Sequence, residues 1–279
     1  MADGSSTAGP SREQLIHALY EASELEHNLM CTYLYAAFSL KSEGEGLSAA
    51  EQAAVDRWRK AITDVAIEEM GHLAAVWNIT SAVGGQPRFG RGNFPIDPGY
   101  LPAGIVVKLA PFNDNVLQHF IFLERPSGST ELEGAGFESV PFQRSTDSGC
   151  LTPMGVAYET VGDFYHWLGH SLGGMAERLG EQHTFAGDRD LQLGPKQIDL
   201  NGVKPVICLK TALQAFDAIV RQGEGASVDT ENSHYHKFCA IREELKALKA
   251  ANPRFEPAWP AATNPVLRRP PNPEGRVWL

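Results

Sequence analysis

Apolar residues recur every three to four positions in the first third of the chain, which is the spacing of one face of an α-helix. The first run spans residues 11–40 and begins with Ser11 followed by a glutamine three positions later, a capping-box signal. The second spans residues 48–83, begins with Ser48 in the same way, and ends before a pair of glycines. Because only a short loop separates the two runs, we expect an antiparallel helical hairpin.

Helical spacing returns in the second half of the chain, at residues 160–181, 205–224 and 231–248. The last two runs follow one another almost in register, so they predict one column of a bundle with an interruption between them. Together with the first hairpin, these runs predict an all-α four-helix bundle over residues 11–250.

The connection between the two halves of the bundle is long and irregular. Residues 85–157 are rich in Gly, Pro and Ser, and they contain two short apolar runs, at 105–110 and 119–123, that predict short strands. We interpret this segment as a crossover and not as a domain, because so little strand cannot bury a core. Residues 1–10 predict a flexible tail, and the proline-rich residues 251–279 predict an extended C-terminal tail.

Composition excludes several classes of function. The chain has 279 residues, 43% of them hydrophobic, and a net charge of −10, so it can build a core but offers no surface for nucleic acid or an anionic membrane. No apolar stretch is long enough to span a membrane, and the N-terminus does not resemble a signal peptide. The four cysteines include no CxxC pair, so we expect a cytoplasmic protein with reduced thiols.

The informative residues are polar side chains at positions where the helical pattern calls for an apolar one. These are Glu26, Glu69, His72, Glu231 and His234. Buried carboxylates are costly unless they are paired or bind a metal. Residues three apart share a helix face, so the two Glu-x-x-His sequences each direct a carboxylate and an imidazole at one point, as in dimetal carboxylate bundles. Two divalent ions would balance four such carboxylates.

The remaining ligands are open from the pattern alone. Asp163 can ligate from the helix at 160–181 or merely close a capping box with Thr160, and Glu159 lies one turn earlier. His166 and His170 share a face with Asp163. Each is either a partner that supports a ligand from outside the site or a surface residue.

Two further residues have both a structural and a functional interpretation. Glu224 stands between glycines and either turns inward beside His234 or ends a helix. Tyr33 either packs in the core or lines a pocket and carries a proton. The competing interpretation of the whole set is structural, with Glu69 in solvent, Glu26 in a salt bridge and the histidines hydrogen-bonded in the core.

Five motifs in chain order carry a resemblance to a known family: Glu26-His-Asn-Leu-Met-Cys-Thr-Tyr-Leu-Tyr, Glu68-Glu69-Met-Gly-His72-Leu, Thr160-Val-Gly-Asp163-Phe-Tyr, Gln222-Gly-Glu224-Gly and Ser233-His234-Tyr235. They resemble the ferritin-like domain of the iminophenyl-pyruvate dimer synthase (VioB-like) family over residues 11–245. The likeness includes Leu-x-Pro-Phe and Phe-x-x-x-Glu-Arg-Pro pieces of the crossover. It implies a ferritin-like bundle with a metal centre and a role in natural-product biosynthesis.

The resemblance also implies a ligand set, namely Glu26, Glu69, His72, Asp163, Glu224 and His234. Asp163 stands where the family usually has Glu, and its side chain is one methylene shorter. The family's reaction is the oxidative coupling of two amino-acid-derived imines, which a chain of this size need not perform.

Together these observations favour a non-haem di-iron oxidoreductase that uses O₂ and acts on a small amino-acid-derived or aromatic molecule. Iron suits a carboxylate-rich set with two imidazoles and no thiolate better than zinc does, and manganese is the alternative metal. The competing hypotheses are a ferritin-like metal-binding or storage protein and a scaffold for a larger biosynthetic enzyme. A small homo-oligomer is compatible with each of these functions.

Overall fold

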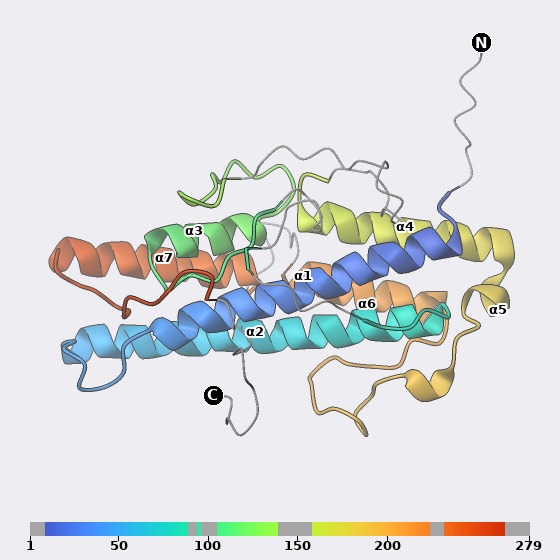
Figure 1. Cartoon of the computed structure of the whole chain (residues 1–279), viewed down its shortest axis with the longest axis horizontal. Coiled ribbons are helices and arrows are strands. Elements are labelled where there is room, and N and C mark those ends of the chain that lie inside the picture. The colour runs from blue at the N-terminus through green and yellow to red at the C-terminus, as the bar shows by residue number, and fades with distance from the viewer. Residues whose placement is uncertain (1–8, 89–93, 96–104, 139–157, 224–231, 266–279) are drawn as a thin grey trace, which may run out of the picture.

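A computed structural model describes residues 9–88, 94–95, 105–138, 158–223 and 232–265 of the chain. Two long antiparallel helices, α1 (Arg12–Ser39) and α2 (Ala49–Ala82), run the length of the molecule (Figure 1). Both begin with the predicted capping boxes, in which Ser11 and Ser48 accept a backbone N–H and the third helical residue returns a hydrogen bond. The helical hairpin expected from the sequence is therefore present.

The other two columns of the bundle are each interrupted near their middle. One consists of α3 (Asp114–Leu123) and α4 (Val161–Leu179), and the other of α6 (Leu209–Gln222) and α7 (His234–Ala251). Helix α3 packs on α7 in one half of the bundle, while α4 packs on α6 in the other half (Figure 1). A short α5 (Glu181–Thr184) and a 3₁₀ turn, η3 (Arg189–Leu191), lie between α4 and α6.

The crossover does not contain the predicted strands. Residues 119–123 belong to α3, and residues 105–110 are irregular apart from a single bridge residue at Val107. Helix α3 forms because Asn113 caps its N-terminus and because its apolar residues fall on one face, which packs against α7. A short apolar run fits either a strand or a buried helix, and here only the cap before it distinguishes the two.

Most of the core lies along the apolar faces of the helices. In α1 and α2 the predicted faces are fully buried, including Leu19, Leu29 and Ile62. In α6 the buried face is instead Ala212, Phe216 and Ile219, and Leu213 is exposed. Helix α6 contacts both α2 and α4, and the face that it turns towards them does not include Leu213.

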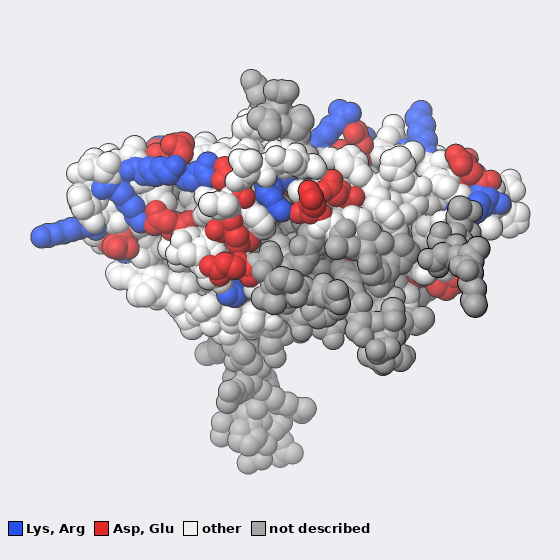
Figure 2. Space-filling view, turned by 90° about the horizontal axis from the view of Figure 1, so that it is seen from above, with Lys and Arg blue, Asp and Glu red and all other residues white. Residues whose placement is uncertain are grey.

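Residues 252–265 follow the surface after α7 and pair with the end of α1. A single antiparallel bridge joins Leu40 to Ala258, and Phe255 packs in the core against Trp58. In the described part of the chain, no helix combines the length and apolarity needed to cross a lipid bilayer. Among the described residues on the face drawn in Figure 2, basic and acidic side chains are interspersed.

Candidate metal centre

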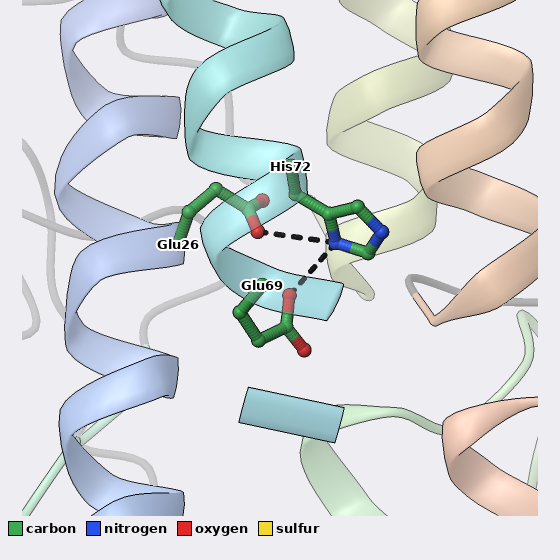
Figure 3. A group of neighbouring side chains, drawn as sticks. All are labelled: Glu26, Glu69 and His72. Atoms are coloured by element: carbon green, nitrogen blue, oxygen red, sulfur yellow. Dashed lines mark hydrogen bonds and ion pairs between the residues drawn. The ribbon is translucent and has the colours of Figure 1, made fainter. Parts of the chain in front are cut away.

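A buried cluster of carboxylates and imidazoles lies where the two interrupted columns break. Glu26 reaches in from the middle of α1, and Glu69 and His72 project from adjacent positions on one face of α2 (Figure 3). Nδ1 of His72 lies 2.7 Å from Oε2 of Glu69 and 3.3 Å from Oε2 of Glu26. All three side chains are almost completely shielded from solvent, so their polar atoms depend on one another and on buried neighbours for partners.

The second half of the cluster comes from the ends of α3 and α7. Glu124 is the residue that ends α3, and His234 is the first residue of α7. Nδ1 of His234 lies 3.1 Å from Oε1 of Glu69 and 3.5 Å from Oε2 of Glu124. Both of these residues are also fully buried. The break in each column thus places one potential metal ligand, Glu124 or His234, at the centre of the bundle.

Glu69 is shared between two groups of potential metal ligands. Glu26, Glu69 and His72 form one group and Glu69, Glu124 and His234 form the other, with the ligand atoms of each group within 4.8 Å of one another. One oxygen of Glu69 faces His72 and the other faces His234. A carboxylate that presents one oxygen to each of two sites is the arrangement needed to bridge two metal ions.

Polar side chains fix the orientation of both imidazoles from the outside. Nε2 of His72 lies 3.0 Å from Oε1 of Gln222, and Nε2 of His234 lies 2.6 Å from Oε2 of Glu68, which also accepts from Lys237 at 2.8 Å. When Nε2 carries the proton for these bonds, Nδ1 of each ring is left as a lone-pair donor that points into the cluster.

Two tyrosines hold the two outer carboxylates. The hydroxyl of Tyr165 donates to Oε1 of Glu26, and that of Tyr33 donates to Oε1 of Glu124. Each hydrogen bond leaves Oε2 of the same carboxylate facing the cluster. The ring of Tyr33 also packs against Phe120 and Phe238, so this residue is both a core residue and a partner of the site.

The charges in the cluster shift one another strongly. Burial raises the pKa of Glu26 to about 8, and Glu69 adds to this rise. Burial alone would also raise the pKa of Glu69, but the charges of His234 and His72 outweigh it and hold that pKa well below its usual range. Burial opposes protonation of His72, yet Glu69 and Glu26 raise the pKa of His72 to about 10. In the same way, Glu124 and Glu69 raise the pKa of His234 well above its usual value.

These shifts mean that positive charge is favoured on both sides of Glu69. An imidazole must lose its proton to bind a metal, so a divalent cation at either position would take over the charge that the proton supplies. The cluster therefore favours cations at the two points where its ligand atoms converge.

The hydrogen-bond inventory supports this fit. Within the described part of the chain, Oε2 of Glu26, Oε1 of Glu69, Oε2 of Glu124 and Nδ1 of His234 are buried and form no hydrogen bond. Buried polar atoms are normally satisfied, and each one that is not requires an explanation. All four atoms face the two convergence points, which is where metal ions would satisfy them.

Gly223, which ends α6, leaves room for this cluster. A Cβ atom at this position would lie 2.5 Å from Nδ1 of His234 and 2.9 Å from Oε2 of Glu124, closer than Cβ contacts normally come. This close approach accounts for a glycine at the position. The backbone therefore passes directly beside two of the ligand atoms.

We expect Gly223→Ala to weaken metal binding at the Glu124–His234 side, because the new methyl group displaces both ligand atoms. Metal content measured by inductively coupled plasma mass spectrometry should fall from about two ions per chain towards about one. Gly173→Ala is the matched control, since a Cβ there meets nothing within 4 Å. Removing that mid-helix glycine should instead raise stability by about 0.5–1 kcal/mol. Unchanged metal content in Gly223→Ala would show that the glycine is not needed by the centre.

Comparison with known proteins identifies the family to which the chain belongs. The family model described as Ferritin-like matches residues 19–243, which is most of the chain. The chain belongs to the ferritin-like family. The fold that the motifs predict is thereby confirmed. A ferritin-like protein from Caulobacter vibrioides has a similar structure, with a TM-score of 0.53, 20% sequence identity, and coverage of 90% of this chain and 75% of that one.

Two curated relatives confirm the resemblance that the motifs predict. The 2-imino-3-(indol-3-yl)propanoate dimerase of Chromobacterium violaceum is 29% identical over 95% of this chain, and the dichlorochromopyrrolate synthase of Lentzea aerocolonigenes is 28% identical over 94% of it. The ferritin-like chain spans only 26% and 28% of the length of these two proteins. Both relatives are enzymes by name, one a dimerase and the other a synthase.

Within this ferritin-like fold, the structure brings together four of the predicted site residues, namely Glu26, Glu69, His72 and His234. Glu224 and Glu231 lie outside the described residues. The remaining member, Glu124, was missed because it follows a segment predicted to be a strand. Its signal in the sequence is the Phe-x-x-x-Glu-Arg-Pro piece of the crossover, in which it is the acidic residue.

Asp163 is not among the residues whose ligand atoms converge. Its carboxylate accepts a hydrogen bond from N of Thr160 at 3.2 Å, and its own N–H donates to Oγ1 of Thr160 at 3.1 Å. This is the capping role that the sequence left as the alternative to ligation. Glu159, His166 and His170 are exposed at the surface.

Asp163→Ala should therefore act on stability and not on the centre. Loss of a cap hydrogen bond costs about 1 kcal/mol, measured by urea denaturation, while metal content should match the wild type. A fall in metal content would return Asp163 to the ligand set that the family resemblance implies.

Proposed function

We propose that the chain is a non-haem di-iron oxidoreductase that acts on a small amino-acid-derived or aromatic molecule in natural-product biosynthesis. The observation that carries this proposal is Glu69, a buried carboxylate whose two oxygens face two separate Glu–His groups. Carboxylate and imidazole ligands without thiolate suit iron, and manganese is the alternative.

In this proposal Glu26 and His72 would hold one ion, Glu124 and His234 would hold the other, and Glu69 would serve both. The three described carboxylates leave one positive charge of two divalent ions unbalanced. Glu231, which precedes His234 by three residues, or Glu224, beside Gly223, supplies the fourth carboxylate. Glu68 and Gln222 keep both imidazoles in the tautomer that ligates through Nδ1, and Tyr33 and Tyr165 hold the outer carboxylates in place.

A pair of irons supplies the electron transfer to O₂ that an oxidation requires. The chain's own contribution is to exclude water, because the five ligands are buried, and to fix ligand geometry through the outer hydrogen bonds. The name of the first relative, 2-imino-3-(indol-3-yl)propanoate dimerase, points to a 2-imino acid with an aromatic side chain as the substrate class. Joining two such molecules by one new bond removes a hydrogen atom from each, and O₂ that accepts both electrons and both protons becomes hydrogen peroxide.

The proposal is tested by turnover of iron-loaded protein. The chain is loaded anaerobically with Fe(II), exposed to O₂, and supplied with imino acids that an L-amino-acid oxidase generates from tryptophan. We expect a product with the mass of two imino acids less two hydrogen atoms, formed faster than in the same mixture with Glu69→Ala protein. Equal product formation with and without the bridging carboxylate would refute the proposed activity.

A further inference from the structure

A pocket of about 650 Å³ opens beside His72, one of the two imidazoles of the cluster. Its walls are α2, α6, residues 201–205 and Lys237 of α7. It is lined by His72 together with Gln222 and Glu68, which are the partners of the outer nitrogens of His72 and His234. We call this the α2–α6 pocket. A molecule inside it would lie beside His72, whose Nδ1 faces Glu69 in the cluster. Its volume is within the range of pockets that hold small organic ligands.

The charges that line the α2–α6 pocket are paired, with one exception. Asp64 pairs with Lys60, Asp217 pairs with Arg221, and Glu68 pairs with Lys237. The remaining charged residue is Lys204, whose ammonium group has no ion-pair or hydrogen-bond partner among the residues that the structure describes. Its backbone is fixed in place, because its carbonyl accepts from Nδ2 of Asn78 at 2.9 Å. The pocket therefore has one uncompensated positive charge at its rim.

Apolar side chains face the same space. Ile67 projects from α2 with 44% of its surface exposed, and Ala75 and Pro205 also line the wall. An exposed isoleucine beside a cavity gains from being covered by an apolar ligand. The pocket thus combines an apolar wall with one cation, which matches a molecule that has an apolar body and one acidic group.

Gly71 gives an independent indication that this space is kept open. It lies in the middle of α2 and lines the pocket, where glycine destabilises a helix relative to alanine. Packing does not require a glycine there, since an added Cβ would meet only the backbone oxygen of Asn201, at the ordinary contact distance of 3.6 Å. The missing side chain leaves free volume next to His72.

We propose that the α2–α6 pocket binds a small aromatic carboxylic acid, with the carboxylate on Lys204 and the ring against the apolar wall beside His72 and Gln222. This proposal rests on the proposed function, because it names where the substrate of that reaction binds and which group recognises its acid. It assigns Lys204 as a specificity-determining residue outside the metal centre.

The test uses a matched pair of probes, 3-(indol-3-yl)propanoate and its neutral amide, titrated by calorimetry into protein loaded anaerobically with Fe(II). We expect the acid to bind about tenfold more tightly than the amide, because only the acid forms a charge-assisted bond with Lys204. Lys204→Met should remove this preference. Lys210→Met, which changes an exposed lysine on α6 outside the pocket, should keep it. Ala218→Trp, which fills the pocket, should abolish binding of both probes, whereas Ala247→Trp on the exposed face of α7 should not.

The proposal is overturned if neither probe binds the wild type, if the acid and the amide bind equally, or if the preference for the acid survives in Lys204→Met. The last result would mean that the carboxylate binds elsewhere, for instance on the metal itself. Iron content is measured on the same samples. If iron is absent while the Lys204-dependent preference remains, the pocket proposal stands and the proposed function fails. If iron is bound without that preference, the pocket proposal fails, while the iron binding that the proposed function requires is retained.

Discussion

Glu69→Ala should lose most of the metal that the wild-type chain binds, from about two ions to fewer than one, because it removes the only described carboxylate that faces both ligand groups. Each group would be left with a single carboxylate and a single imidazole from the described residues. Both imidazoles would also lose the negative charge of Glu69, which now lies beside each of them. The measurement is metal per chain by mass spectrometry after anaerobic loading and gel filtration.

Two companion variants make this result specific. Glu69→Gln keeps the volume of the side chain but removes its charge, so it should lose metal as Glu69→Ala does and thereby exclude a mere cavity effect. Glu177→Gln changes an exposed carboxylate on α4 and should retain the wild-type content. Wild-type content in both Glu69 variants would show that the two groups do not share this residue.

Glu124→Gln should lose one metal and keep the other. Its carboxylate belongs only to the group with His234, whereas the group of Glu26 and His72 does not include it. We therefore expect about one ion per chain, and the mirror variant Glu26→Gln should lose a similar share from the opposite side. Metal analysis combined with electron paramagnetic resonance separates the two outcomes, since a lone ion and a coupled pair give different spectra.

The control for Glu124 is Glu159, the residue that the sequence offered as an alternative ligand. Glu159 is exposed at the surface, so Glu159→Gln should leave metal content and spectrum unchanged. If Glu159→Gln loses metal while Glu124→Gln does not, then the assignment of the second group is wrong.

Part of the centre was predictable because its residues break a long and regular pattern. Glu26, Glu69 and His72 stand on apolar faces that extend for several turns on either side, so burial of each followed from periodicity alone. His234 was identified from its spacing to Glu231. These predictions needed no knowledge of how the helices pack, because each residue shows its inward orientation within its own helix.

Glu124 and the pocket were not predictable in this way, because both depend on where helices end. Glu124 follows a ten-residue helix that is too short to show its period and whose second half looks like a strand. Asp163 posed the reverse problem, since an acidic residue at the third helical position serves a cap and a ligand set equally well. The pocket is lined by residues of α2, α6, α7 and 201–205, so it exists only once these separate segments have packed together.

The central claim is that two metal ions bind on either side of Glu69, and diffraction from crystals of iron-loaded protein at the iron absorption edge tests it most directly. We predict two anomalous peaks, one beside Glu26 and His72 and the other beside Glu124 and His234, with the carboxylate of Glu69 between them. An anomalous map without a peak in this cluster, or with a single peak that Glu69 does not contact, would contradict the account.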